Sequence, residues 1–257
     1  MIGWLVACAA PSAHAPEAVG QWVWTDDDVV RLEEVRAARP DVVAGVHVAT
    51  VRYANGAFTN ELGLSPTVVE GPLAVVVRLD DDVNQSWDEL SDDAIAAGLD
   101  GALGRVLTLI HTRPVSVVEV QLDYDAPVRR LARWAGVLAK LRTGSLANEH
   151  VWVTSLVAHV REPAYGSLFR DLIEGHVLQV FDTGDDVGDA ASVGRLAEQA
   201  GLRYRLGVGA FERTGLHPTA HRAWFAHLDE ACPAPRCESV WVFPAGRPYL
   251  DLLGDSK

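Results

Sequence analysis

The sequence predicts a closed (β/α)8 barrel of the TIM type, with an open doubly wound sheet as the alternative. From residue 21 onward, eight short apolar segments alternate with longer amphipathic segments. Most of the short segments are continuous apolar runs, which is typical of parallel strands buried on both faces. Eight strands with intervening helices in about 240 residues match the size of such a barrel. The open sheet would carry a glycine-rich phosphate loop after its first strand, but this chain has Trp24-Thr25-Asp26-Asp27 there.

The predicted strands are rich in Val, Trp and Phe, and the predicted helices lie between most of them. Strands are expected at 21–24, 42–51, 73–79, 116–122, 151–157, 177–181, 204–210 and 240–243, and helices at 26–39, 91–110, 128–142, 164–174, 189–200 and 218–230. The first helix opens with three Asp residues, which suit the positive end of a helix dipole. The segment 52–72 contains Gly, Asn and Pro and is expected to form a loop in place of a helix.

The charge and histidine content of the chain limit which ligands and partners we expect it to bind. The 257 residues include 22 Lys and Arg against 35 Asp and Glu, giving a net charge of −13. Such an acidic field repels phosphate backbones, so we expect no nucleic-acid partner. Residues 21–257 are expected to form one barrel domain. Barrel metal sites usually need several His at strand ends, and this chain offers mainly His159, so we expect no metal and no cofactor.

Cysteines bear on the cellular compartment. Leu5-Val6-Ala7-Cys8 resembles a bacterial lipobox in which Cys8 is lipidated, and residues 1–20 then form a degenerate signal with a flexible tether. The apolar run before Cys8 has only seven residues and no Lys or Arg, unlike a full signal. We expect export to the cell envelope, with membrane contact only through a lipid on Cys8; a cytoplasmic location is the alternative. Cys232 and Cys237 are placed either to form a disulfide or to remain two separate thiols.

Acidic residues collect where the predicted strands end, which is where barrel enzymes place their active sites. On the fourth predicted strand, Glu119, Gln121, Asp123 and Asp125 alternate onto one face. Four polar groups in a row cannot face apolar helices without a desolvation cost, so we expect them to point into the barrel. Two neighbouring carboxylates raise one another's pKa, which would let one act as a general acid.

A structural role is the alternative for the same acids. Asp125 would cap the helix that starts at Pro127, and Asp123 would pair with Arg78. Other side chains at or near the strand ends are candidates for ligand contact; they are Trp22, Trp24, Asp80, Gln121, Gln179, Glu212 and Trp241.

Three blocks of the sequence resemble the bacterial family known as domain of unknown function 3142. They are Trp22-Val23-Trp24, the segment 120–125 with its helix 131–142, and Val177-Leu178-Gln179-Val180. Two positions depart from that family. It tends to have Gln-Arg where this chain has Thr25-Asp26, and His where this chain has Phe181.

The fourth strand also resembles, more loosely, that of chitinase-type glycoside hydrolases, which are barrels with the pattern D-x-x-D-x-D-x-E. This chain reads Val118-x-x-Gln121-x-Asp123-x-Asp125, with Asp in place of the final Glu. The resemblance implies that Asp125 is the general acid, Asp123 its charge partner and Asp182 an orienting group. It leaves two functions open.

The first function is an envelope enzyme that hydrolyses a glycan, with Trp22, Trp24 and Trp241 as stacking surfaces. The second is a non-catalytic barrel that binds a saccharide or a protein partner and in which the acids are structural. The missing Glu favours the second function. So does Phe181, which stands where the chitinase-type enzymes have Tyr.

Overall fold

Eight parallel strands close into a barrel in the computed structural model, which describes residues 18–181, 188–210, 224–233 and 235–253. Within these residues, nine strands form one sheet in the order β1-β9-β8-β7-β6-β5-β4-β2-β3. β1 also pairs with β2, and this pairing closes the ring of parallel strands. The predicted (β/α)8 fold is therefore confirmed.

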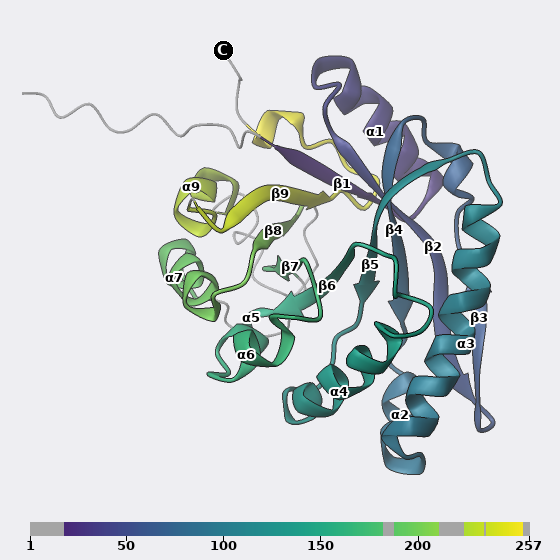
Figure 1. Cartoon of the computed structure of the whole chain (residues 1–257). Coiled ribbons are helices and arrows are strands. Elements are labelled where there is room, and N and C mark those ends of the chain that lie inside the picture. The colour runs from purple at the N-terminus through teal and green to yellow at the C-terminus, as the bar shows by residue number, and fades with distance from the viewer. Residues whose placement is uncertain (1–17, 182–187, 211–223, 234, 254–257) are drawn as a thin grey trace, which may run out of the picture.

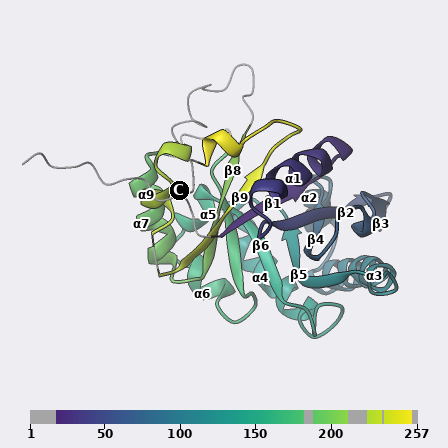
Figure 2. The ribbon, with the colours of Figure 1, turned by 90° about the horizontal axis from the view of Figure 1, so that it is seen from above.

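Each barrel strand overlaps one predicted strand. The strands are β1 (Val19–Val23), β2 (Val43–Ala54), β4 (Pro72–Leu79), β5 (Ser116–Asp123), β6 (Val151–Leu156), β7 (Gly175–Gln179), β8 (Tyr204–Gly209) and β9 (Cys237–Phe243). The helices in the described part are α1 (Asp26–Ala38), α2 (Val83–Glu89), α3 (Asp92–His111), α4 (Leu131–Leu141), α5 (Val157–Val160), α6 (Tyr165–Phe169), α7 (Ala190–Ala200) and α9 (Leu228–Ala231). Short 3-10 turns occur at Pro66–Val68, Val128–Arg130 and Leu250–Leu252. The helices lie outside the strands in both views (Figures 1 and 2).

The segment 52–72, expected to be a loop, instead completes a hairpin. β3 (Ala57–Leu62) pairs antiparallel with the end of β2, and the two strands are joined by Asn55 and Gly56. Both residues have positive φ, 55° and 76°, as two-residue hairpin turns require. β3 lies outside the barrel against α3, where the side chain of Asn60 donates to the carbonyl of Ala102 at 3.0 Å.

The helices differ from the prediction in four places. α2 and α5 were not predicted, and the helix expected at 164–174 is shorter. Of the helix expected at 218–230, residues 218–223 lie outside the described residues, 224–226 are helical, and α9 covers the end.

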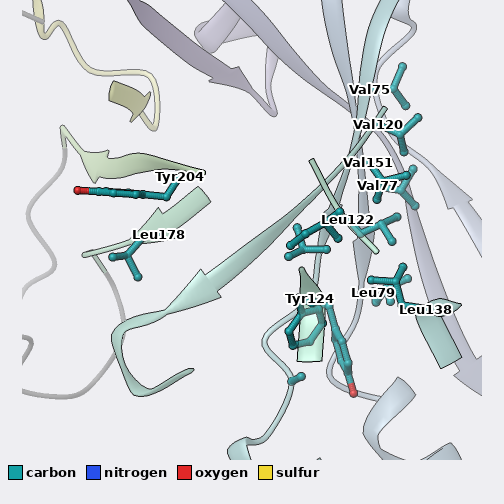
Figure 3. Close-up of a cluster of buried hydrophobic side chains, with 14 of the residues drawn as sticks. Val75, Val77, Leu79, Val120, Leu122, Tyr124, Leu138, Val151, Leu178 and Tyr204 are labelled. Atoms are coloured by element: carbon teal, nitrogen blue, oxygen red, sulfur yellow. The ribbon is translucent and has the colours of Figure 1, made fainter. Parts of the chain in front are cut away.

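The main core lies between the outer faces of the strands and the helices. Figure 3 shows part of this layer, in which side chains of β4, β5 and α4 pack together: Val75, Val77, Leu79, Val120, Leu122 and Leu138. α3 belongs to the same layer. By length and composition alone it could cross a membrane, with a mean hydropathy of 1.2. Its apolar face is instead buried, through Ile95, Leu99, Leu103 and Val106, which is the packing of a barrel helix.

Indole rings fill a second core inside the barrel. Trp22, Trp152 and Trp241 point inward and are almost fully buried, and the rings of Trp22 and Trp241 lie 5.6 Å apart. Glycines on neighbouring strands provide the space for these rings. A Cβ atom at Gly45 would lie 2.5 Å from the Trp241 ring, and one at Gly20 would lie 2.3 Å from it. Packed interiors tolerate such overlap poorly.

We predict that Gly45→Ala destabilises the protein by about 1–3 kcal/mol, because the new methyl group must displace the Trp241 ring. Gly136→Ala is the matched control. Gly136 is an exposed position of α4 where a Cβ meets no atom within 4 Å, and Ala favours a helix over Gly by up to about 1 kcal/mol. Urea denaturation of both variants measures the difference. Equal stability of the two variants would contradict the packing argument.

Candidate ligand-binding site at the barrel mouth

A ladder of polar side chains runs up the inner face of β5. Glu119, Gln121 and Asp123 all point into the barrel, as the alternation indicates, and all are buried. The Nε2 of Gln121 donates to Glu119 at 2.8 Å, and the indole Nε1 of Trp22 donates to Gln121 at 2.9 Å. The face predicted to be inward is therefore fully engaged in hydrogen bonds across the barrel.

The lower end of this ladder is an ion pair. Arg205 of β8 donates to both carboxylate oxygens of Glu119, with Nη2 2.8 Å from Oε2. Its guanidinium also lies over the ring of Trp152, 3.6 Å from the centroid, and 5.2 Å from that of Trp241. Charge pairing and cation–π contacts together offset the cost of burying this arginine. The N-terminal half of the barrel is thus filled with side chains.

The upper end of the ladder is Asp123, where β5 ends. Its Oδ2 accepts from Nη1 of Arg78 on β4 at 3.3 Å. Its Oδ1 accepts from the hydroxyl of Thr154 on β6 at 2.9 Å and from the amide of Gln179 on β7 at 3.5 Å. Asp123 is only 5% exposed. Its pairing with Arg78 is the arrangement that the structural alternative anticipated.

Aromatic rings surround this polar group at the C-terminal end of the barrel. We call this end, lined by Trp24, His47, Arg78, Thr154, Gln179, Phe181, Phe243 and Asp123, the mouth. Trp24 stacks on His47 with centroids 4.2 Å apart, and the guanidinium of Arg78 lies 5.7 Å from the Trp24 ring centroid. Phe181 stacks on Phe243 at 5.7 Å. The aromatic side chains of the mouth are half-buried.

His47 is uncharged at neutral pH in this setting. Burial lowers its pKa, while the carboxylate of Asp123 raises it and the cation of Arg78 lowers it. The Nε2 of His47 also lies 3.0 Å from the hydroxyl of Thr50. The stacking partner of Trp24 is therefore a neutral ring, and Arg78 supplies the positive charge beside Asp123.

A buried carboxylate holds the chain in place at the end of β1, where Trp24 lies. Asp28, fully buried in the first turn of α1, accepts from the backbone N–H groups of Trp24 and Thr25, each at 3.0 Å. It also accepts from the N–H of Gly246 at 2.7 Å. The hydroxyl of Thr25 caps the same helix turn. The end of β1 is therefore held to α1 and to the segment after β9.

The predicted site residues fall into four sets. Trp22, Gln121 and Trp241 lie in the barrel core, and their burial excludes direct contact with a ligand in this conformation. Trp24 and Gln179 lie at the mouth, whereas Asp80 pairs with Arg52 at 3.0 Å. The fourth set lies outside the described residues: Asp182, Glu212 and Cys8.

Asp125 lies two residues beyond the end of β5 and is half-buried. A 3-10 turn follows Pro127. The capping role that the structural alternative gave Asp125 stays a prediction. In the part of the chain that the structure describes, no three His, Cys, Asp or Glu side chains are grouped to hold a metal ion.

Several mouth residues were not predicted as site residues: His47, Thr154, Phe243 and, except as a partner of Asp123, Arg78. Arg78, Thr154 and Phe243 lie within two residues of the ends of their strands, whereas His47 lies in the first half of β2. The same alternation that singled out Asp123 would have marked His47 on 42–51 and Arg78 on 73–79. The signal was weaker there because each is a single polar residue among apolar neighbours.

Together the fold and the mouth define a TIM-type barrel with a filled interior and a polar, aromatic C-terminal end. No protein-family model and no curated protein sequence matches the chain. The proposed membership in the domain of unknown function 3142 family is therefore not shown.

Solved structures share the fold. The spore cortex-lytic enzyme of Bacillus cereus matches with a TM-score of 0.53 and 11% identity, over 80% of this chain and 54% of that enzyme. The chain thus spans about half the length of that relative. Concanavalin B matches with a TM-score of 0.53 and 11% identity, over 89% of this chain and 93% of its own. Such low identity shows the fold alone.

We predict that Glu119→Gln destabilises the protein by about 3 kcal/mol or more, because it leaves the buried Arg205 cation without its main counter-charge. Asp93→Asn is the control, because it breaks the exposed ion pair with Lys140 and exposed pairs contribute little. Thermal and urea denaturation measure both changes. A Glu119→Gln variant as stable as Asp93→Asn would show that the buried pair does not hold the barrel together.

Proposed function

We propose that this chain is an exported, non-catalytic barrel that binds a glycan at its mouth. The observation that carries the proposal is Arg78. Its side chain is 32% exposed, is anchored by Asp123 on Nη1 and lies over Trp24. The described residues give its remaining N–H groups no acceptor, so they can donate to ligand oxygens. Half-buried aromatic rings beside such donors suit the apolar and hydroxyl faces of a sugar.

Two further features support the proposal. One enzyme of the same fold is named as a spore cortex-lytic enzyme. The structure joins Cys232 and Cys237 in a disulfide, and disulfides persist in oxidising compartments outside the cytoplasm. We also propose residues 21–257 as one domain, and membership in the domain of unknown function 3142 family on the three sequence blocks given above.

Binding is favoured over catalysis by the state of Asp123. This carboxylate is paired with a cation and accepts hydrogen bonds from Thr154 and Gln179. Such contacts suit an acceptor that holds Arg78 and Gln179 in place. The resemblance to chitinase-type enzymes makes Asp123 the charge partner of a general acid, but here its charge is already matched by Arg78.

We predict that Arg78→Gln weakens glycan binding at least about tenfold, equivalent to about 1.4 kcal/mol. Calorimetric titration with oligosaccharides of N-acetylglucosamine, glucose and peptidoglycan glycan strands provides the measurement. Arg133→Gln is a matched control, because Arg133 also lies over a Trp ring and pairs with an Asp, but on the outer surface. The proposal fails if the wild type binds none of these sugars, or if both variants lose affinity equally.

Glycan hydrolysis is the second candidate function, and Asp125 favours it. This acid stands where the resemblance to chitinase-type enzymes places the general acid, and it is half-buried beside the mouth. If the barrel is a hydrolase, Asp125→Asn should lower reducing-sugar release by about 100-fold or more, the usual contribution of a general acid. Asp80→Asn, which alters an acid paired with Arg52, should keep its activity. Absence of hydrolysis by the wild type would leave binding as the function.

A further inference from the structure

The segment that carries Asp123 and Asp125 is held in place by the next strand and helix. Thr154 of β6 accepts from the N–H of Tyr124 at 3.0 Å through the same hydroxyl that donates to Asp123. One ring nitrogen of His159 on α5, Nε2, lies 2.7 Å from the carbonyl oxygen of Ala126. These two side chains are the contacts through which β6 and α5 hold the chain on either side of Asp125.

The hydrogen bonds of His159 define its tautomer. Its second ring nitrogen, Nδ1, accepts from the N–H of Leu156 at 3.2 Å. A backbone N–H can only donate and a carbonyl oxygen can only accept. Nδ1 must therefore be unprotonated, and the ring proton sits on Nε2 and is donated to Ala126. His159 is 2% exposed, so water does not replace either partner.

We propose that His159 is the positioning residue of the mouth, which holds the Asp123–Ala126 segment in place only as the neutral, Nε2-protonated ring. This inference rests on the proposed function in taking the mouth as the ligand site. Its geometric content is independent of any ligand. His159 acts on the mouth through the backbone of Ala126.

Protonation would break this arrangement. An imidazolium carries N–H groups at both nitrogens, so Nδ1–H would face the N–H of Leu156 and the acceptor would be lost. Burial lowers the pKa of His159, and its bond to Ala126 raises it in part. The other titratable groups packed against it are Tyr165 of α6, with ring centroids 6.1 Å apart, and His176 of β7. Neither brings a negative charge at neutral pH.

The sign of the pH effect follows from that depressed pKa. The unfolded chain takes up this proton near the ordinary value of 6.5, whereas the folded chain resists it. The stabilisation by neutral His159 is therefore complete above pH 6.5 and declines as the pH falls below it. The Asp125 segment should loosen over the same acidic range.

Two substitutions separate the two hydrogen bonds, since Asn places a polar atom near Nδ1 and Gln places one near Nε2. We predict that His159→Asn keeps the hydrogen bond from the N–H of Leu156 and loses the one to the carbonyl of Ala126. His159→Gln should keep the bond to Ala126 and lose the one from Leu156. Amide hydrogen exchange of the unliganded protein reports both bonds. The N–H of Leu156 donates to His159 directly, whereas the N–H of Ala126 donates to the carbonyl of Tyr124 at 2.9 Å, within the segment that His159 holds through the Ala126 carbonyl. Exchange at Ala126 should rise about tenfold in His159→Asn only, because the released segment opens, and exchange at Leu156 should rise about tenfold in His159→Gln only. The barrel amide of Val120 serves as the reference for global opening.

His176→Asn is the matched control. His176 is also fully buried, but its Nδ1 contacts the hydroxyl of Ser155 at 2.6 Å and not the backbone of Leu156 or Ala126. This variant should leave the exchange at Ala126 unchanged relative to Val120. A rise at both amides in both His159 variants would overturn the inference, as would ring nitrogen NMR shifts that place the proton on Nδ1.

Measuring oligosaccharide affinity in the same variants distinguishes a failure of this inference from a failure of the proposed function. If the mouth binds a glycan, affinity for the best oligosaccharide should fall at least fivefold in His159→Asn and recover in His159→Gln. If no glycan binds, the proposed function fails, and the exchange pattern alone still decides whether His159 positions the segment. Unchanged affinity in His159→Asn, with binding intact in the wild type, would refute the positioning role.

Discussion

The Glu119–Arg205 ion pair inside the barrel constrains most of the other inward-facing side chains. Two charges in a nearly dry interior are tolerated only if their remaining hydrogen-bonding groups are satisfied. Gln121 therefore donates to Glu119, and Trp22 donates to Gln121, so that one chain of contacts joins β8, β5 and β1. The indoles that enclose this chain need space, and glycines on adjacent strands provide it. Side chains therefore fill the N-terminal half of the barrel, which is why the proposed ligand site lies at the mouth.

At the mouth the same need to pair buried charges gives Asp123 and Asp125 different roles. Asp123 continues the polar ladder, and its charge is matched by Arg78, so its contacts order the ring of donors around it. Asp125 lies beyond the strand, where barrel register no longer dictates its partners. An acid in the first position is best suited to building a site, and the proposed hydrolysis would depend on the acid in the second. This difference is why binding and hydrolysis make separable demands on the two residues.

Much of this could be read from the sequence, because parallel strands buried on both faces leave continuous apolar runs. The inward face of β5 was also predictable, since a strand alternates with period two and charges avoid apolar helices. β3 was missed because it lies outside the barrel, is mostly exposed and carries no such pattern. The partners of the inward acids were missed for another reason. Glu119 meets Arg205 across 86 positions of chain, and only barrel closure and register bring such pairs together.

Two buried histidines of the outer layer differ in whether a change in their protonation can affect the mouth. Burial lowers the pKa of His176 to about 3, and within the described residues its Nε2 has no partner. It therefore remains neutral in the fold at any ordinary pH, and its loss would be felt as packing. His159 uses both ring nitrogens on backbone groups, one of them next to Asp125. A proton on His159 would change the end of β5, whereas His176 has no such route. The outer layer therefore influences the mouth through hydrogen bonds to the backbone just beyond the strand ends, where the chain no longer pairs with neighbouring strands.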